Sequence, residues 1–326
     1  MHRDRLKGMF VGVFLGDALG APHERREDRD NVYTGKLEHT SSRFNRFTGV
    51  TTVTPVGAIT DDSEMTLALL NSIIAWKDYY DDSAIQSYLD WAASGCDSMG
   101  KNTRAMLKSS KKGVALGKRG YKSRHDKCLE TPENERSKGN GTLMRATPLV
   151  LSKNYLKASI DDARMTNPTR VNEECNIIYV STLIDILLGK STELVQEYFC
   201  RDVWNIYSNR RERDVSGADK GYVLYGLHFA LMAANYDLRT PEPYSTLMGE
   251  IIRKGGDTDT NAAIAGGVLG ARLGFEAMMK EDITRSNFET MMNSEWNESR
   301  PREYTVVELD RLVDAATAIF MKNREP

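Results

Sequence analysis

Glycine recurs at every fourth position in two separate stretches of this 326-residue chain. The glycines are Gly8, Gly12, Gly16 and Gly20 in the first stretch, and Gly266, Gly270 and Gly274 in the second. Since four residues make slightly more than one helical turn, each set forms a slowly drifting ridge without side chains. A glycine inside a helix costs roughly 1 kcal/mol relative to alanine. The spacing therefore predicts two helices that each approach another backbone closely; the alternative is a poorly formed helix or a loop.

Helical periodicity dominates the rest of the chain. Apolar residues recur three and four positions apart in residues 63–80, 171–190, 221–235 and 305–322, as in amphipathic helices. Residues 49–55, rich in Val and Thr, have the composition of a strand but lack a second run to pair with. We therefore predict an all-α fold. No internal repeat or interdomain linker is evident, so we expect residues 1–326 to form a compact single domain.

The overall charge excludes some partners. Lys and Arg number 44 and Asp and Glu number 46, which gives a formal net charge of -2. A chain of this balance has no global field that recruits nucleic acid or an anionic membrane. We therefore expect no nucleic-acid binding, and any charged ligand must be held by a local patch.

Cysteine usage and hydropathy indicate a cytoplasmic protein. The cysteines, Cys96, Cys128, Cys175 and Cys200, show no CxxC spacing and are typical of reduced, mostly buried thiols. The first 21 residues resemble a signal peptide, but Asp17 interrupts their apolar run. Elsewhere no apolar run reaches the roughly 18 residues that suggest a membrane span.

Carboxylates occur in three short polar clusters, each at the border of a predicted helix. The five carboxylates are Glu24, Asp61, Asp62, Asp257 and Asp259, accompanied by Thr60 and Thr260. Helix capping explains one such residue at each site, because an Asp or Thr oxygen accepts the free N–H groups of a first turn. Three oxygen-bearing side chains in succession exceed that need. Capping and convergence on one site therefore both stay open at this point.

Convergence would create a site for divalent cations. Five ionised carboxylates in one volume raise one another's pKa values unless cations compensate their charge, and two divalent ions supply +4. Only oxygen donors are present in the three clusters, which favours Mg²⁺, Mn²⁺ or Ca²⁺ over zinc. Two such ions roughly 3.5 to 4 Å apart could bind substrate oxygens and lower the pKa of a bridging water.

A glycine-containing turn provides a candidate anion site. In SKGNGTLMRATPL, residues 137–149, glycines and an asparagine can adopt left-handed backbone angles. Consecutive N–H groups in such a turn form a concavity that binds phosphate or pyrophosphate; an ordinary tight turn is the alternative. Arg145, further along, could pair with a phosphate or form a structural salt bridge.

A basic stretch lies between the predicted helices at residues 63–80 and 171–190. Residues 101–127 contain ten Lys and Arg residues and one acidic residue, Asp126. A solvated basic loop is the first interpretation, and contact with phosphates or an acidic macromolecular substrate is the second. Residues 128–141 read as a polar surface loop.

Four motifs in a fixed order resemble the ADP-ribosylglycohydrolase family, which includes dinitrogenase reductase-activating glycohydrolase and ADP-ribosylarginine hydrolases. They are GVFLGDALGAPHE, ITDDSEMTLALL, SKGNGTLMRATPL and KGGDTDTNAAIAGGVLGARLG. The resemblance extends from about residue 6 to residue 275. It implies an all-α fold with a central cleft that binds two Mg²⁺ or Mn²⁺ ions and hydrolyses the bond at C1 of the distal ribose of ADP-ribose.

The resemblance also implies roles for residues of this chain. The metal ligands would be Thr60, Asp61, Asp62, Asp257, Asp259 and Thr260. Gly139, Asn140, Gly141 and Thr142 would hold the diphosphate or the distal ribose through backbone N–H groups. Glu24 would be a ligand or a gate at the cleft, and Asp97 would lie beside the ribose.

The implied mechanism is metal-assisted glycoside hydrolysis. A carboxylate moves a proton between a water and the departing group, and Glu24 and Asp61 are the candidates. Two positions depart from the family pattern: Asn167 follows Thr166 where the family often has histidine, and Ser63 replaces threonine. The change at residue 167 could alter the preference for the leaving group or weaken turnover.

Three functions are compatible with these residues. The first is a hydrolase acting on an ADP-ribosylated protein, most simply at ADP-ribosyl-arginine, or on a small ADP-ribose derivative. The second is a non-catalytic ADP-ribose binder or crystallin-like relative, which the retention of all six ligand residues disfavours. The third is a two-metal phosphoesterase, which would release AMP and ribose phosphate from ADP-ribose.

Overall fold

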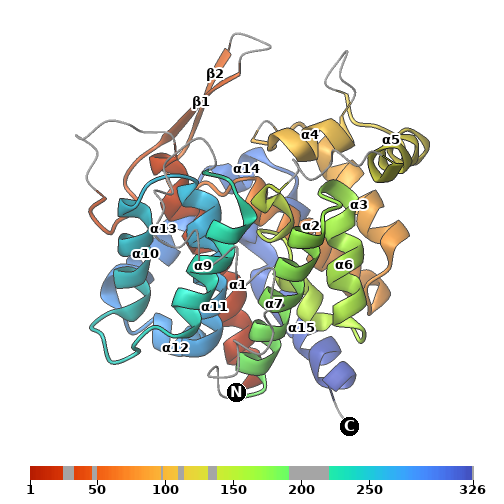
Figure 1. Cartoon of the computed structure of the whole chain (residues 1–326). Helices are drawn as coiled ribbons and strands as arrows, with labels where there is room; N and C mark the ends of the chain where they lie inside the picture. The colour runs from red at the N-terminus through yellow and green to blue at the C-terminus, as the bar shows by residue number, and fades with distance from the viewer. Residues whose placement is uncertain are drawn as a thin grey trace.

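The computed structural model describes residues 1–24, 33–45, 50–96, 98–108, 114–130, 138–190 and 220–324. These residues are mainly helical, with one two-stranded sheet (Figure 1), and the predicted all-α fold class is confirmed. The α-helices are α1 (His2–Gly20), α2 (Asp61–Trp76), α3 (Asp81–Ala93), α4 (Lys101–Leu107), α5 (Lys118–Glu130), α6 (Tyr155–Thr166), α7 (Arg170–Leu187), α9 (Val223–Ala234), α10 (Pro243–Arg253), α11 (Thr258–Leu273), α12 (Phe275–Met278), α13 (Asp282–Met292), α14 (Trp296–Ser299) and α15 (Leu309–Arg324). Short 3₁₀-helices are η1 (Ala21–His23), η3 (Asn140–Thr142), η4 (Thr147–Leu151), η6 (Arg302–Tyr304) and η7 (Val306–Glu308).

Helices α1 and α11 form a closely packed antiparallel pair. A Cβ atom added at Gly12 would lie 2.1 Å from the carbonyl oxygen of Gly266, and one added at Gly8 would lie 2.3 Å from that of Gly270. The two predicted glycine ridges therefore exist, and they face each other. Gly274 is the exception, because it ends α11 with a φ of 79° and lies against Asp4.

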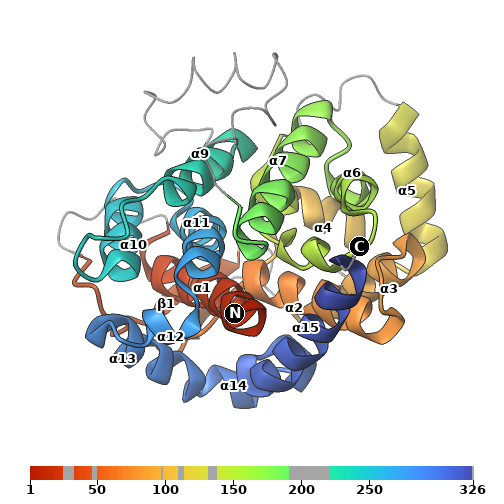
Figure 2. The same cartoon turned by 90° about the horizontal axis from the view of Figure 1, so that it is seen from below.

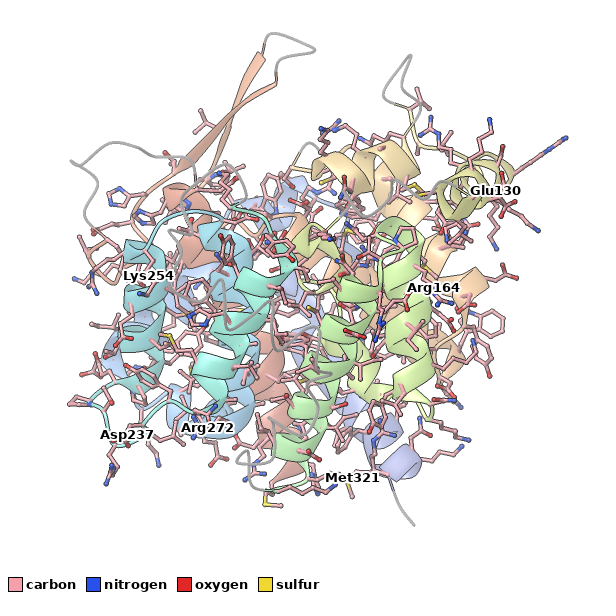
Figure 3. All side chains as sticks on the ribbon, in the orientation of Figure 1. Glu130, Arg164, Asp237, Lys254, Arg272 and Met321 are labelled. Atoms are coloured by element: carbon pink, nitrogen blue, oxygen red, sulfur yellow. The ribbon has the colours of Figure 1, made fainter. Side chains whose placement is uncertain are left out.

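The α1–α11 pair is surrounded by other helices (Figure 2). Helices α7, α9 and α10 pack on α11, while α2 and α15 pack on α1. Helix α1 is buried on every side from Gly8 to Gly20, so its apolar residues do not need the one-sided pattern of a surface helix. Charged side chains such as Glu130 at the end of α5, Asp237 in the α9–α10 connection and Lys254 just after α10 project outward (Figure 3).

All four helices predicted from apolar spacing are present. Residues 63–80 correspond to α2, residues 171–190 to α7, residues 221–235 to α9 and residues 305–322 to α15. Their ends differ by a few residues, because capping and short 3₁₀ turns determine where a helix begins. The first turn before α15, for example, is the 3₁₀-helix η7.

The strand prediction was half right. Residues 50–54 form strand β2 (Val50–Thr54), but it pairs antiparallel with β1 (Ser41–Asn45), with Ser41 opposite Thr54. The expectation that no partner run exists was therefore wrong. The sequence of β1, SSRFN, has neither the β-branched content nor the clear alternation by which strands are identified.

The basic stretch is not a plain loop. Its described part contains helices α4 and α5. Between the two helices, Lys108 and Ala115 form an isolated antiparallel β-bridge. The loop prediction was wrong there, because α5 is a polar helix with Tyr121 as its buried residue and so lacks the apolar stripe that marks a helix. The first three residues of the predicted polar loop 128–141 also belong to α5, and residues 131–137 lie outside the described residues.

Two further expectations concern thiols and membranes. Cys96 and Cys175 are buried and Cys128 is partly buried, and none of these three described cysteines forms a disulfide; Cys200 lies outside the described residues. Among the described helices, none combines the length and the apolar composition needed to cross a bilayer.

Candidate functional site

The acidic clusters meet at one end of the α1–α11 pair. Because the two helices are antiparallel, the end of α1 lies beside the beginning of α11, where the Thr258 hydroxyl donates to the Gly20 carbonyl at 2.8 Å. Helix α2 begins at the same place, since the Thr60 N–H donates to Asp17 of α1 at 2.9 Å. The glycine ridges thus position three chain segments that are far apart in sequence.

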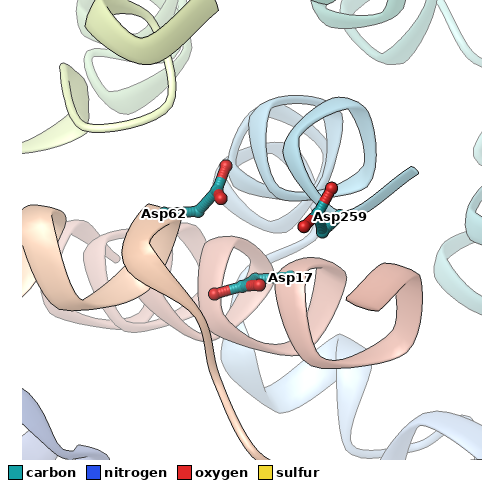
Figure 4. Close-up of side chains that lie close together, drawn as sticks. All are labelled: Asp17, Asp62 and Asp259. Atoms are coloured by element: carbon teal, nitrogen blue, oxygen red, sulfur yellow. The ribbon is translucent and has the colours of Figure 1, made fainter. Parts of the chain in front are cut away.

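Two groups of carboxylates result from this packing. Asp17, Asp62 and Asp259 form the first group (Figure 4), and Glu24, Asp257 and Asp259 form the second. Within each group one oxygen per residue lies within 4.8 Å of the others. Asp259 belongs to both groups, so the two possible ion positions share one carboxylate. Of the two interpretations, capping and convergence, the structure bears out convergence, since Glu24, Asp62 and Asp259 come from the three separate clusters.

Helix capping accounts for a small part of this arrangement. Thr60 is the N-cap of α2, and its side chain accepts from the N–H of Asp62. Asp257 occupies the N-cap position of α11 but makes no side-chain cap hydrogen bond. Instead it accepts from the Asn140 side-chain amide at 2.7 Å. Capping alone therefore does not explain these carboxylates.

Burial and mutual repulsion raise the pKa values of the cluster. Burial raises the pKa of Asp17 to about 6, although hydrogen bonds from Ser63 and Thr60 oppose the shift. Burial is also the largest cause of the raised pKa of Asp62 and of Asp259, followed by the charges of neighbouring carboxylates. The pKa of Asp257 is raised by burial and then by the charge of Glu24. A nearby cation would remove this electrostatic cost.

One buried oxygen lacks a partner. Asp62 is 2 % exposed, and its Oδ1 atom accepts no hydrogen bond from any described residue. Its other oxygen lies 3.1 Å from the Thr60 hydroxyl. A buried carboxylate oxygen without a donor is costly, and carboxylate oxygens are the ligands that Mg²⁺ and Mn²⁺ favour. The residues present therefore fit divalent cations.

The remaining predicted ligands line the same volume. Asp61 accepts the Gly100 N–H at 3.1 Å, and its own N–H donates to the Ser98 hydroxyl. Thr260 is 5 % exposed, and its proximity opposes the rise in the pKa of Asp62. Both face the cleft between the helix ends. Asp97 lies outside the described residues.

The glycine turn adopts a different backbone from the predicted one. Residues Asn140–Thr142 form the 3₁₀-helix η3, and Gly139 is extended with a φ of -71°. No residue of this turn has a positive φ, so the prediction of left-handed angles was wrong. Gly139, Asn140 and Gly141 line the cleft, whereas Thr142 is fully buried and its hydroxyl accepts from Asn172 at 3.0 Å.

Arg145 has a structural role. It is fully buried, pairs with Asp162 at 2.9 Å, and donates to the Gly141 carbonyl at 2.9 Å. It also donates to the Thr166 hydroxyl at 3.0 Å, next to Asn167, which lines the cleft. Of the two interpretations of Arg145, the structural salt bridge is confirmed, and the guanidinium supports the glycine turn from behind.

The cleft has a volume of about 720 Å³ and two kinds of charge. Its carboxylates lie at the helix ends, and its cationic side chains are Lys101, Lys138 and Lys220. The Lys220 ammonium lies 3.5 Å from Glu24. Lys101 belongs to the basic stretch 101–127, for which contact with phosphates was the second interpretation, whereas nothing local distinguishes Lys138 and Lys220 from other surface lysines.

Asp17 was also missed as a residue of the site. It is fully buried, and it receives hydrogen bonds from the backbone and side chains of Thr60 and Ser63. A signal was present in the sequence, since Asp17 is a charged residue within an apolar, glycine-rich run. Such a residue inside a buried helix requires compensating partners.

Comparisons with known proteins agree with this geometry. The sequence model of the ADP-ribosylglycohydrolase family matches residues 1–306. The ADP-ribosyl-dinitrogen reductase glycohydrolase of Rhodospirillum rubrum is 25% identical over 280 residues, which cover 84% of this chain and 87% of that protein. A protein of Acanthamoeba polyphaga mimivirus, provisionally named ADP-ribosyl glycohydrolase, is 26% identical over 307 residues, covering 82% of this chain and 86% of its own length.

A solved structure supports the fold. A chain of an ADP-ribosylglycohydrolase-related protein complex superposes with a TM-score of 0.66 at 23% identity, over 98% of this chain and 99% of that one. The family match extends over nearly the whole chain and indicates ADP-ribosylglycohydrolase activity. The chain therefore belongs to the ADP-ribosylglycohydrolase family.

Proposed function

We propose that this protein hydrolyses the glycosidic bond between C1 of the distal ribose of ADP-ribose and a modified side chain, with arginine as the modified residue. The observation that carries the proposal is the pair of carboxylate groups, one buried and one partly buried, that share Asp259 at the cleft. The name of the Rhodospirillum rubrum relative supports an ADP-ribosylated protein as the substrate.

We propose two divalent cations, Mg²⁺ or Mn²⁺, as cofactors. Their ligands would be Thr60, Asp61, Asp62, Asp257, Asp259 and Thr260, which line or border the cleft. Bound cations supply Lewis-acid chemistry, since they orient substrate hydroxyls and lower the pKa of a water. The partnerless oxygen of Asp62 and the raised pKa values of its neighbours support this assignment.

The cationic side of the cleft suits the diphosphate of ADP-ribose. Lys101 and Lys138 line the cleft together with Gly139 and Gly141. Ammonium groups and turn N–H groups both favour a phosphate oxygen. This division orients the substrate, with its anionic diphosphate at the lysines and its reacting ribose at the carboxylates.

We assign the proton transfer to Glu24. Its side chain lines the cleft, is 14% exposed and is ion-paired with Lys220 at 3.5 Å. Asp61, the other candidate, is held by the Gly100 N–H. A carboxylate in the position of Glu24 can take a proton from the attacking water and return it to the leaving group.

Glu24→Gln tests this assignment. Because general base catalysis is worth about 100- to 10,000-fold, the variant should lose at least about 100-fold in kcat and keep its affinity for Mn²⁺. Turnover and calorimetric Mn²⁺ binding are the measurements. An equal loss of Mn²⁺ binding would make Glu24 a ligand, and full activity would move the proton transfer to Asp61.

The activity itself is tested with a panel of peptides carrying ADP-ribose on arginine, serine or other side chains. The protein is incubated with each peptide and Mg²⁺ or Mn²⁺, with and without chelator, and the products are resolved by mass spectrometry. Release of intact ADP-ribose from the arginine peptide is expected. Release of AMP would instead indicate a phosphoesterase, and binding without any product would indicate a non-catalytic ADP-ribose binder.

Divalent cations should stabilise the protein in a pH-dependent way. Because the raised pKa values of Asp17, Asp62, Asp257 and Asp259 exceed those of the unfolded chain, the metal-free fold binds extra protons and loses stability as pH rises above about 4. Cations replace those protons. At 100 times the Kd, Mn²⁺ should raise Tm by roughly 5 °C near pH 7.5 and by less near pH 5.5.

Differential scanning fluorimetry with chelated and Mn²⁺-loaded protein measures this effect. The Lys220 ammonium, paired with Glu24 at 3.5 Å, is a cation that faces these carboxylates and opposes the rise in the pKa of Asp257. A Tm that does not respond to Mn²⁺ or Mg²⁺ at either pH would contradict the cation site.

We also propose that residues 1–326 form a single domain. Helices from both ends of the chain support this, because α15 packs against α1 and α2, and α11 packs against α1.

A further inference from the structure

Asp17 directs all of its described hydrogen bonds to the beginning of α2. Its Oδ1 atom accepts from the Thr60 hydroxyl at 2.8 Å. Its Oδ2 atom accepts from the Thr60 N–H at 2.9 Å, the Ser63 N–H at 3.1 Å and the Ser63 hydroxyl at 2.5 Å. One carboxylate of α1 thus holds the backbone and the hydroxyl groups of two residues of another helix.

These contacts distinguish Asp17 from the other carboxylates of its group. A carboxylate has about four lone-pair positions, and four protein donors already point at Asp17. Its Oδ2 atom has three donors, so it has no room for a cation. Asp62 shows the opposite pattern, since its Oδ1 atom is buried and accepts from no described residue. Asp17 therefore supports the ligands without being one of them, although it is close enough to be grouped with them.

The direction of the Thr60 hydroxyl proton decides whether the Thr60 oxygen can bind a cation. This proton can be donated to one acceptor at a time, and Asp17 at 2.8 Å is closer than Asp62 at 3.1 Å. When Asp17 takes it, the Thr60 oxygen, which also accepts the Asp62 N–H at 3.4 Å, keeps one lone pair for a further partner. A neutral hydroxyl can ligate a cation only when its proton points away from the ion.

We infer that Asp17 is a positioning residue, which accepts the Thr60 proton and so presents the Thr60 oxygen to a divalent cation held with Asp62. The inference rests on the metal site of the proposed function and adds a residue to it. Partners behind a ligand orient it, and their loss typically lowers metal affinity about 10- to 100-fold. Ser63 has a supporting part, because it fixes the other oxygen of Asp17.

A double-mutant cycle tests the inference by calorimetric Mn²⁺ binding. Asp17→Asn keeps the size of the side chain but replaces one of its two accepting oxygens with an NH₂ group, which can only donate. We expect it to lower Mn²⁺ affinity about 10- to 100-fold. The Thr60→Val background lacks the hydroxyl. In that background, Asp17→Asn should lower Mn²⁺ affinity by less than a further factor of about two, since Asp17 acts through Thr60.

Ser63→Ala is the matched control. It removes one donor to Asp17 but keeps the Thr60 contact, so it should lower Tm while Mn²⁺ affinity changes less than about threefold. Circular dichroism checks the fold of every variant. If Asp17→Asn does not fold, Asp17→Glu retains the charge and displaces the carboxylate, and a fall in Mn²⁺ affinity is again expected.

The outcomes separate the possibilities. Unchanged Mn²⁺ affinity in a folded Asp17→Asn or Asp17→Glu variant would overturn the inference and leave Asp17 as a helix cap. An equal loss with and without the Thr60 hydroxyl would also overturn it, because Asp17 would then be a ligand itself. Wild-type protein that binds no Mn²⁺ would instead contradict the proposed metal site.

Discussion

Asp259→Asn is expected to abolish hydrolysis of ADP-ribosyl substrates and to leave the helical fold intact. Asp259 is 6 % exposed and is the carboxylate shared by both groups. Asparagine has nearly the same shape, and its oxygen can still accept from the Thr260 N–H, as Asp259 does at 2.9 Å. The lost charge removes a ligand from both ion positions. A loss of more than about 100-fold in kcat is expected, since outer partners alone contribute about 10- to 100-fold.

The melting temperature of the Asp259→Asn variant tests the role of Asp259 more sharply than its kcat does. In the metal-free protein, Asp259 is a buried carboxylate whose pKa is raised by burial and by its acidic neighbours. Its replacement relieves that repulsion, so the metal-free Tm should stay equal or rise, while the increase in Tm caused by Mn²⁺ should disappear. Thermal melts with and without Mn²⁺ measure both effects.

Asp282→Asn is a matched control for Asp259→Asn. Asp282 also lies in the first turn of a helix, α13, but its side chain is 83% exposed and pairs with Arg285. It should change neither turnover nor the response to Mn²⁺. An Asp259→Asn variant that fails to fold would favour a capping role, and one that stays active would remove Asp259 from the mechanism.

Gly12→Ala is expected to be the most destabilising small substitution in the helix pair. Its Cβ would lie 2.1 Å from the Gly266 carbonyl oxygen and 2.7 Å from the carbonyl carbon. Both atoms belong to the backbone, so no side chain can rotate away and the helices must separate. Helix propensity alone predicts a gain of roughly 1 kcal/mol, whereas overpacking typically costs about 1 to 3 kcal/mol and sometimes more. With overpacking at the upper end of that range, we expect a net loss of about 2 kcal/mol.

Chemical denaturation measures the change in unfolding free energy, and Gly120→Ala is the control. Gly120 lies in helix α5, where an added Cβ would meet the flexible Leu116 side chain at 3.2 Å. That substitution should be neutral or slightly stabilising. Gly12→Ala should also weaken Mn²⁺ binding, because α1 and α11 hold Asp17 and Asp259 at a fixed separation. An unchanged unfolding free energy would contradict the close contact.

Local patterns predicted the helices that carry an apolar stripe, but they did not predict the elements without one. Apolar spacing identified α2, α7, α9 and α15, because these helices bury one face or more. Helix α5 and strand β1 were missed, since neither carries an apolar pattern of its own. The backbone angles of Gly139 and its neighbours were also predicted wrongly, because composition permits a left-handed turn without requiring one.

The site shows the same division. The residue types and helix borders of Asp61, Asp62, Asp257 and Asp259 are visible in the sequence, and they indicated oxygen ligands for hard cations. Asp17 and Lys220 were not identified, because their importance depends on partners far away in the chain. Asp17 contacts Thr60, 43 positions later, and Lys220 pairs with Glu24, 196 positions earlier.

The sequence by itself determined which helices carry a strong apolar pattern, where glycine allows two backbones to touch, and which acidic side chains stand at helix borders. These properties are local, since they depend on side-chain chemistry within a few turns. The tertiary structure alone decided that the end of α1, the start of α2 and the start of α11 meet, and that Asp17 turns toward Thr60. The pairing of α1 with α11 joins residues about 240 positions apart, from Gly20 to Thr258, and depends on the packing of the whole molecule.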